Sequence, residues 1–293
     1  MKRNLLTCVV LAMAGLLGPG AAAYMPYDPN AELKSVGVAN DEPSLLSYLR
    51  DGLPEGPMSN GRPLDTPYRW QRYVDAVHAL GKMKSGTAVP ILTGMLEGPL
   101  PAKLAADLEL SIADRQRDRD REYGHVNFQS SCANALGQIG DATAAPALTR
   151  YVERLLPLMK AKSQTSLYPV YTMAFRETCV ALGKLGNSTG VAFAVAALPD
   201  VPLDDPWAAY TLRELTGQPF GPRSGHPARV ARREYAKWTA WWEANKATYT
   251  VDPAAVAQRK SRGDDIVDMK TLRDYVHQAP LAKFGRIQPA LSR

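Results

Sequence analysis

The sequence predicts an all-α protein, folded as a right-handed superhelix of about four stacked helical pairs. The main observation is a sequence motif that occurs three times: Ala-Leu-Gly, then a short polar turn, then a second apolar segment. The three copies cover residues 79–92, 135–148 and 181–194. A second observation is that the apolar residues in each copy have helical spacing. Units of this size that recur along a chain pack on one another and form a continuous core.

The second copy shows why the motif predicts a helix, a turn and an antiparallel helix. Leu136 and Ile139 fall on one face of the first helix. Gly140 permits a left-handed C-terminal cap, Asp141 can cap the next helix, and Pro146 suits its first turn. Each copy is therefore expected to form one helical pair.

The repeat positions also predict which residues form the core and how closely the units approach. Ala135 and Gly137 are small, so a neighbouring helix can pack close to them. The expected core consists of apolar residues on the inner faces of the paired helices. These are Leu80, Met83, Leu92, Leu136, Ile139, Leu148, Leu182, Leu185, Leu212 and Leu215.

The repeated motif resembles the HEAT repeat, in particular the short form of phycobilisome-lyase-type HEAT-like proteins. Residues 135–148 match its Ala-Leu-Gly-x-Ile-Gly-Asp-x-x-Ala-x-x-x-Leu pattern almost completely, whereas Lys84 and Ser85 replace Gly-Asp in the first copy. A fourth, degenerate copy begins at Trp207, and its end is similar to the terminal unit of secreted bacterial HEAT-like proteins. The resemblance covers residues 66–246. It implies the helical superhelix but indicates little about activity.

The first 23 residues have the features of a secretory signal. Lys2 and Arg3 precede an apolar run, and three alanines that end at Ala23 form a small-residue cleavage site. The run is too short to span a membrane comfortably, which argues against an anchor. We therefore expect cleavage after Ala23 and a periplasmic or secreted protein with no integral membrane segment in the mature chain.

The net charge argues against a nucleic-acid binder. Removal of residues 1–23 takes away Lys2 and Arg3 but no acidic residue, so the formal charge falls from +6 to +4. This excess is mild, and an exported protein seldom meets nucleic acid.

Two segments flank the repeats. Residues 24–65 are rich in Pro and Gly and are expected to be irregular, with one short helix over 43–50 that Asp41 opens. Residues 247–293 contain no repeat, and we expect an irregular tail with a short helix over 270–278.

Unequal spacing of the repeat leucines reveals two inserted spacers, over about 99–127 and 157–171. Insertions in a repeat protein lie on one face and often bind partners. The first spacer is either a solvated helix extension or a charged docking arm. The second is expected to be a turn before a helix over 172–186, and its tyrosines are candidate contacts. The candidate partner-binding residues are Arg115, Arg117, Arg119, Arg121, Tyr168 and Tyr171.

The two cysteines of the mature chain leave two interpretations open. Cys132 and Cys179 occupy near-equivalent positions in successive units, one residue out of register. Stacking could bring them together as a disulfide in an oxidising compartment. Alternatively, they are two buried free thiols that pack as small apolar residues.

The sequence contains no recognisable catalytic, cofactor-binding or metal-binding motif. The four histidines are scattered and lack metal-ligand neighbours at useful spacing. We therefore expect no cofactor, and an exported, non-catalytic scaffold that binds a protein partner of unknown identity. The alternative is a lyase-like enzyme, or an enzyme accessory factor, built on the same repeats.

Overall fold

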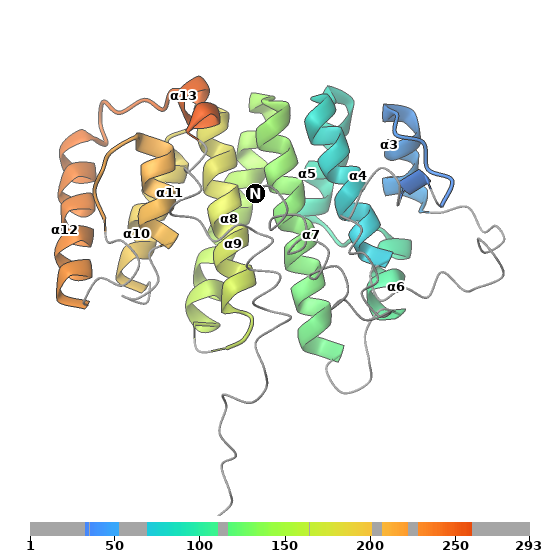
Figure 1. Cartoon of the computed structure of the whole chain (residues 1–293), viewed down its shortest axis with the longest axis horizontal. Helices are drawn as coiled ribbons and strands as arrows, with labels where there is room; N and C mark the ends of the chain where they lie inside the picture. Colours follow the sequence, from blue (N-terminus) through green and yellow to red (C-terminus); the bar gives the residue numbers. More distant parts are fainter. Residues whose placement is uncertain are drawn as a thin grey trace, which may run out of the picture.

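A computed structural model describes residues 33–34, 36–52, 69–110, 117–163, 165–200, 207–221 and 228–259. Within these ranges the chain forms eleven α-helices and no strand. The helices stand side by side along the long axis of the molecule (Figure 1). The predicted all-α stack of helical pairs is confirmed.

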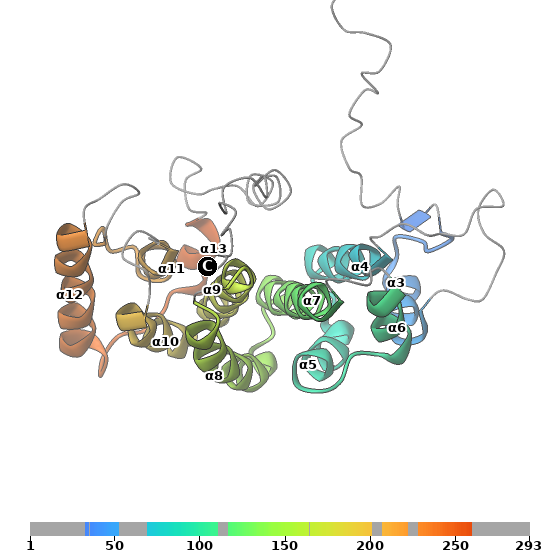
Figure 2. The ribbon, with the colours of Figure 1, turned by 90° about the horizontal axis from the view of Figure 1, so that it is seen from below.

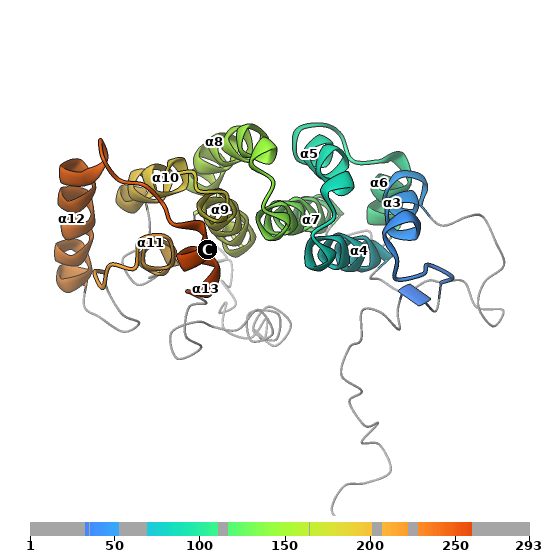
Figure 3. The ribbon, with the colours of Figure 1, turned by 90° about the horizontal axis from the view of Figure 1, so that it is seen from above.

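Four helical pairs form the stack, and each corresponds to one predicted copy of the repeat. The pairs are α4 (Arg69–Met83) with α5 (Val89–Glu97), α7 (Arg117–Ile139) with α8 (Ala145–Ala161), α9 (Tyr168–Lys184) with α10 (Thr189–Ala197), and α11 (Trp207–Thr216) with α12 (Ala228–Asn245). Helices α4, α7, α9 and α11 contact one another in succession and form one layer. Helices α5, α8 and α10 form the second layer (Figures 2 and 3).

The turns within the pairs form as the sequence predicts. Gly140 and Gly186 adopt positive φ angles of 83° and 75°, the left-handed conformation that ends the first helix of a pair. Lys84, which replaces glycine in the first copy, also adopts a positive φ of 53°. The carboxylate of Asp141 accepts a hydrogen bond from the Thr143 amide at 2.9 Å, and a short 3₁₀ turn then leads into α8.

Three further helices pack outside the pairs. Helix α3 (Glu42–Asp51) contacts α4, and its Asp41 carboxylate accepts the Ser44 amide at 2.9 Å, which confirms the predicted short helix. Helix α6 (Ala102–Leu110) lies within the first spacer and contacts α4 and α7.

Helix α13 (Pro253–Gln258) corrects the expectation of an irregular tail directly after the repeats. It packs on α9 and α11, and Val256 is fully buried there. Arg259 donates hydrogen bonds to the Glu214 and Leu215 carbonyls, at 3.4 and 3.1 Å. The helix predicted over 270–278 lies outside the described residues.

The core agrees with the predicted set except at one position. Leu80, Leu92, Leu136, Leu148, Leu182, Leu212 and Leu215 are fully buried. Ile139 and Leu185 are partly buried against the same core. Met83 was predicted to be core, which is wrong, because its side chain is 42% exposed. It is the last residue of α4 and lines a shallow hollow with Asn40 and His78.

Small residues set the distance between units, as the sequence predicts. A Cβ atom added to Gly137 on α7 would lie 2.7 Å from the Ala181 Cα atom on α9. The equivalent Gly81 on α4 would bring its Cβ atom within 3.0 Å of the Ala135 Cα atom on α7. The repeated glycine therefore lets the next unit approach to backbone contact.

The last pair closes the stack with aromatic residues. Trp238 on α12 is fully buried and meets Phe220 and Trp241 edge to face, with ring centroids 5.3 and 5.9 Å apart. Trp241 and Trp242 are partly buried against the same core, with Tyr249 beside them. The aromatic face of α12 therefore packs inward and caps the solenoid.

Candidate functional site

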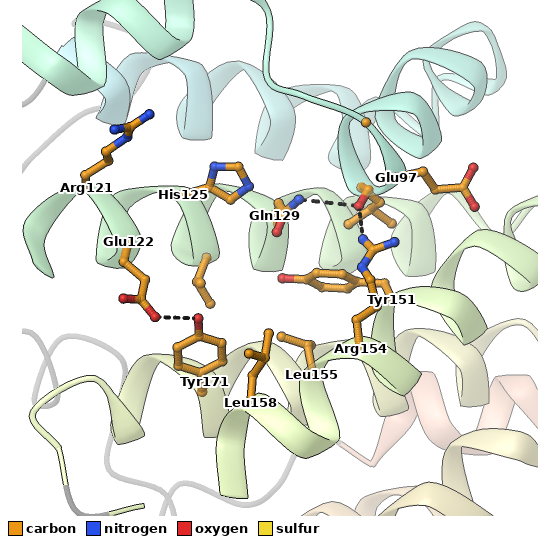
Figure 4. A pocket seen from close by; sticks show the side chains of 13 residues that line it. Glu97, Arg121, Glu122, His125, Gln129, Tyr151, Arg154, Leu155, Leu158 and Tyr171 are labelled. Atoms are coloured by element: carbon orange, nitrogen blue, oxygen red, sulfur yellow. Dashed lines mark hydrogen bonds between the residues drawn. The ribbon is translucent and has the colours of Figure 1, made fainter. Parts of the chain in front are cut away.

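A groove opens where the helices of the second pair extend beyond those of the first. Helix α7 has 23 residues and α8 has 17, whereas α5 has only 9. At a rise of about 1.5 Å per residue, α7 and α8 therefore continue well past the end of α5. The uncovered turns leave a cavity of about 530 Å³ (Figure 4).

The groove is lined by the end of α5, the first half of α7, the second half of α8 and the first turn of α9. The lining residues are Leu96, Glu97, Gly98, Arg121, Glu122, His125, Val126, Gln129, Tyr151, Arg154, Leu155, Leu158 and Tyr171. The first spacer contributes Arg121, Glu122, His125 and Val126, and the second contributes Leu158 and Tyr171. The two insertions therefore meet at a single groove.

One side of the groove is a fixed carboxylate. The Glu122 side chain accepts a hydrogen bond from the Tyr171 hydroxyl at 2.7 Å and forms an ion pair with Lys162 at 2.9 Å (Figure 4). Burial acts to raise the pKa of Glu122, but the Tyr171 and Lys162 interactions outweigh it and the pKa is lowered. Burial and the same hydrogen bond raise the pKa of Tyr171. At neutral pH the pair is therefore an ionised carboxylate and a protonated phenol.

His125, also on α7, is a partly buried imidazole between two arginines that line the groove, Arg121 and Arg154 (Figure 4). Burial lowers the pKa of His125, and the positive charges of Arg121 and Arg154 lower it further. His125 is therefore neutral at pH 7. The other acidic residue of the lining, Glu97, is already paired with Arg150 on α8.

The rim of the groove at α5 is held by side chains from the second pair. The Gln129 amide group donates hydrogen bonds to the Met95 and Leu96 carbonyls, each at 3.3 Å. Arg154 also donates a hydrogen bond to the Leu96 carbonyl. The last carbonyls of a helix have no partner within it, so these bonds both cap α5 and fix the rim.

Comparison with known families identifies the unit that forms the floor of the groove. Residues 128–154, which run from α7 through the turn into α8, match the family model described as PBS lyase HEAT-like repeat. The chain contains a HEAT-like repeat. Comparisons with curated proteins and with solved structures gave no match.

The matched HEAT-like unit contributes several groove residues that sequence reasoning did not select. Gln129, Tyr151 and Arg154 lie within it, whereas Glu122 and His125 precede it on the same helix α7. A signal for some of them exists in the sequence. Arg154 and Leu158 continue the helical spacing of Tyr151 and Leu155, and they lie beyond the ninth residue of α8, past the length of its nine-residue neighbour α5.

Three of the four predicted arginines fall in the first two turns of α7. Arg117 and Arg119 lie in the first turn of α7, and Arg115 lies outside the described residues. Arg121 is exposed and lines the groove. Arg121 is the one of these four whose side chain the structure describes, and it lies at the groove; the binding role of all four stays a prediction.

The predicted tyrosines belong to a helix and not to a loop, which corrects the expected helix start at residue 172. Helix α9 begins at Tyr168, because Pro169 suits the first helical turn. The Tyr168 hydroxyl accepts a hydrogen bond from the Trp207 indole at 3.0 Å. Tyr171 is only 4% exposed. Both residues therefore connect elements of the solenoid, and Tyr171 also forms part of the groove wall.

Both described cysteines are free thiols inside the stack. Cys132 and Cys179 are fully buried, and burial raises the pKa of each thiol. A protonated, inaccessible thiol is a poor nucleophile and a poor metal ligand. The disulfide alternative stays a prediction.

Proposed function

We propose that the protein is an exported, non-catalytic HEAT-repeat scaffold that binds a protein partner through the groove between α5, α7 and α8. The observation that carries this proposal is the convergence of both inserted spacers on one groove. The stacking of helical pairs needs no such insertions, whereas repeat proteins commonly bind partners through them.

The composition of the groove also supports a contact surface for a protein. Leu158 is 42% exposed at its edge, one of only two large apolar side chains that reach this exposure among the described residues. Arg121 and Arg154 are exposed in the same groove. An exposed apolar residue in a groove that also contains arginine and tyrosine is typical of the energetically important centre of a protein interface.

Leu158 should contact the partner directly. We expect a photo-crosslinking residue at position 158 to capture one protein reproducibly from the periplasmic or secreted fraction of the native host. The Leu158→Asp variant should then bind that protein about 30-fold more weakly, because loss of an interface hot spot costs about 2 kcal/mol. Binding can be measured by calorimetry with the purified proteins.

Met83 provides the matched control for this experiment. It has the same 42% exposure but lies at the end of α4, outside the groove. A crosslinker at position 83 should capture nothing comparable, and Met83→Asp should bind like the wild type. Equal crosslinking at both positions would contradict the proposal. Co-purification of a small molecule in place of a protein would favour the enzyme alternative.

Export predicts a processed N-terminus. Mass spectrometry of the protein isolated from its host should show a chain that begins at or near Tyr24, because the small-residue site ends at Ala23. The described part of the structure adds that none of its helices has the length and apolar character needed to cross a bilayer. Recovery of a chain that retains Met1 would exclude cleavage and the proposed compartment.

A further inference from the structure

Tyr151 on α8 presents an unused hydrogen-bonding group inside the groove. Its side chain is only 2% exposed, and its hydroxyl has no hydrogen-bond partner among the described residues. Figure 4 shows the ring pointing into the cavity, and the guanidinium carbon of Arg154 lies 5.6 Å from the ring centroid. A buried tyrosine normally satisfies its hydroxyl, and an unsatisfied one is costly. Because Tyr151 lines the groove, its hydroxyl is an unused donor at the inner wall of that groove.

The charges around this donor favour an anion. Burial keeps the Tyr151 phenol protonated, because it raises the pKa well above its usual value. Burial lowers the pKa of His125, and the positive charges of Arg121 and Arg154 lower it further, so both arginines act on this imidazole in the groove. Of the two carboxylates in the lining, Glu122 is paired with Lys162 and Glu97 with Arg150.

The walls beside this polar end are apolar and open. Leu155 and Leu158 follow Tyr151 along α8 (Figure 4). Val126 on α7 also lines the groove. Leu158, Arg121 and Arg154 are exposed, so the groove is accessible along its side. An open groove that combines arginine side chains, an unused tyrosine hydroxyl and an apolar wall fits a segment of a larger chain better than an enclosed small molecule.

We propose that the groove binds an acidic peptide segment, with the carboxylate of an Asp or Glu side chain at Tyr151, His125 and Arg154. A neighbouring apolar side chain of the same segment packs on Leu155 and Leu158. This inference rests on the proposed function, because it names the chemistry of the partner that the groove receives. The Tyr151 hydroxyl and the Arg154 guanidinium supply charge-assisted hydrogen bonds, which are stronger than neutral ones.

The test uses a random peptide library displayed on phage and selected against the purified mature chain. Selected peptides should be enriched in Asp or Glu next to a large apolar residue. The Tyr151→Phe variant should bind such a peptide at least about tenfold more weakly, since a hydrogen bond to a charged group is lost. Its thermal midpoint should stay unchanged or rise, because the hydroxyl removed has no partner in the fold.

Tyr249→Phe is the matched control. Its hydroxyl lies beside α12, outside the groove, and already donates a hydrogen bond to the Leu215 carbonyl at 3.3 Å. This variant should lose some thermal stability and bind the peptide like the wild type. Tyr151→Phe is thus expected to weaken peptide binding without loss of stability, and Tyr249→Phe to lower stability without loss of peptide binding.

Several outcomes would overturn the inference. Selected peptides without acidic residues, undiminished binding by Tyr151→Phe, or a lower midpoint for that variant would each exclude a free donor for a carboxylate. If decanoate alone binds to the groove and displaces the peptide, the natural ligand would be a small amphipathic carboxylate and not a peptide. If Tyr151→Phe has no effect while Leu158→Asp abolishes partner binding, the anion site fails but the proposed function survives. If Leu158→Asp also has no effect, both fail.

Discussion

Replacement of Gly137 by valine is expected to destabilise the protein by about 3 kcal/mol, the upper end of the usual cost of overpacking. The added Cβ atom would lie 2.7 Å from the Cα atom and 2.8 Å from the Cβ atom of Ala181. Both neighbours are fixed parts of α9, so a flexible side chain cannot move aside and relieve the contact. Helices α7 and α9 would have to separate. The urea midpoint should fall accordingly, which circular dichroism can measure.

Gly94→Val is the control for this prediction. Gly94 lies in the middle of α5, and nothing within 4 Å would meet an added Cβ atom. Valine is a somewhat better helix former than glycine, so the variant should remain within about 0.5 kcal/mol of the wild type. Equal midpoints for the two valine variants would show that Gly137 is not a point of close approach between units.

The repeat could be predicted from the sequence because its determinants are local. The caps at Gly140 and Asp141 act within the same motif, and Gly137 meets Ala181, the alanine of the same motif in the next copy. These caps and glycines predict the same helix boundaries and contacts as the spacing of the apolar residues. The helical pairs were predictable because local sequence preferences and the overall fold agree. Even Lys84, which replaces the glycine of the motif in the first copy, takes the left-handed conformation that the turn requires.

The positions that the sequence did not predict depend on contacts between distant elements. Met83 has the spacing of a core residue, but its exposure is decided by which elements reach the end of α4. Helix α13 is only six residues long and gains its place from packing on α9 and α11. Isolated helices of that length are not stable in water, so periodicity alone could not reveal it.

The groove likewise contains residues that the sequence predicted and residues that it did not. Arg121 and Tyr171 could be selected because they lie in spacers that interrupt the repeat. Tyr151 could not, because its helical spacing is that of a core residue and it is indeed buried. Its hydroxyl has no partner among the described residues, which depends on how α8 packs against the other helices and is visible only once the pairs are stacked.

Leu136→Ala should destabilise the protein by about 2–5 kcal/mol, because it removes a fully buried side chain and leaves a cavity. Leu136 lies on α7, the helix that contacts both α4 and α9, so the defect affects the centre of the stack. Met83→Ala is the matched control, since Met83 was predicted from the same repeat but is 42% exposed. Its unfolding free energy should change by no more than about 0.5 kcal/mol. Urea unfolding of both variants would measure the difference, and an unchanged midpoint for Leu136→Ala would mean that the core of the second unit lies elsewhere.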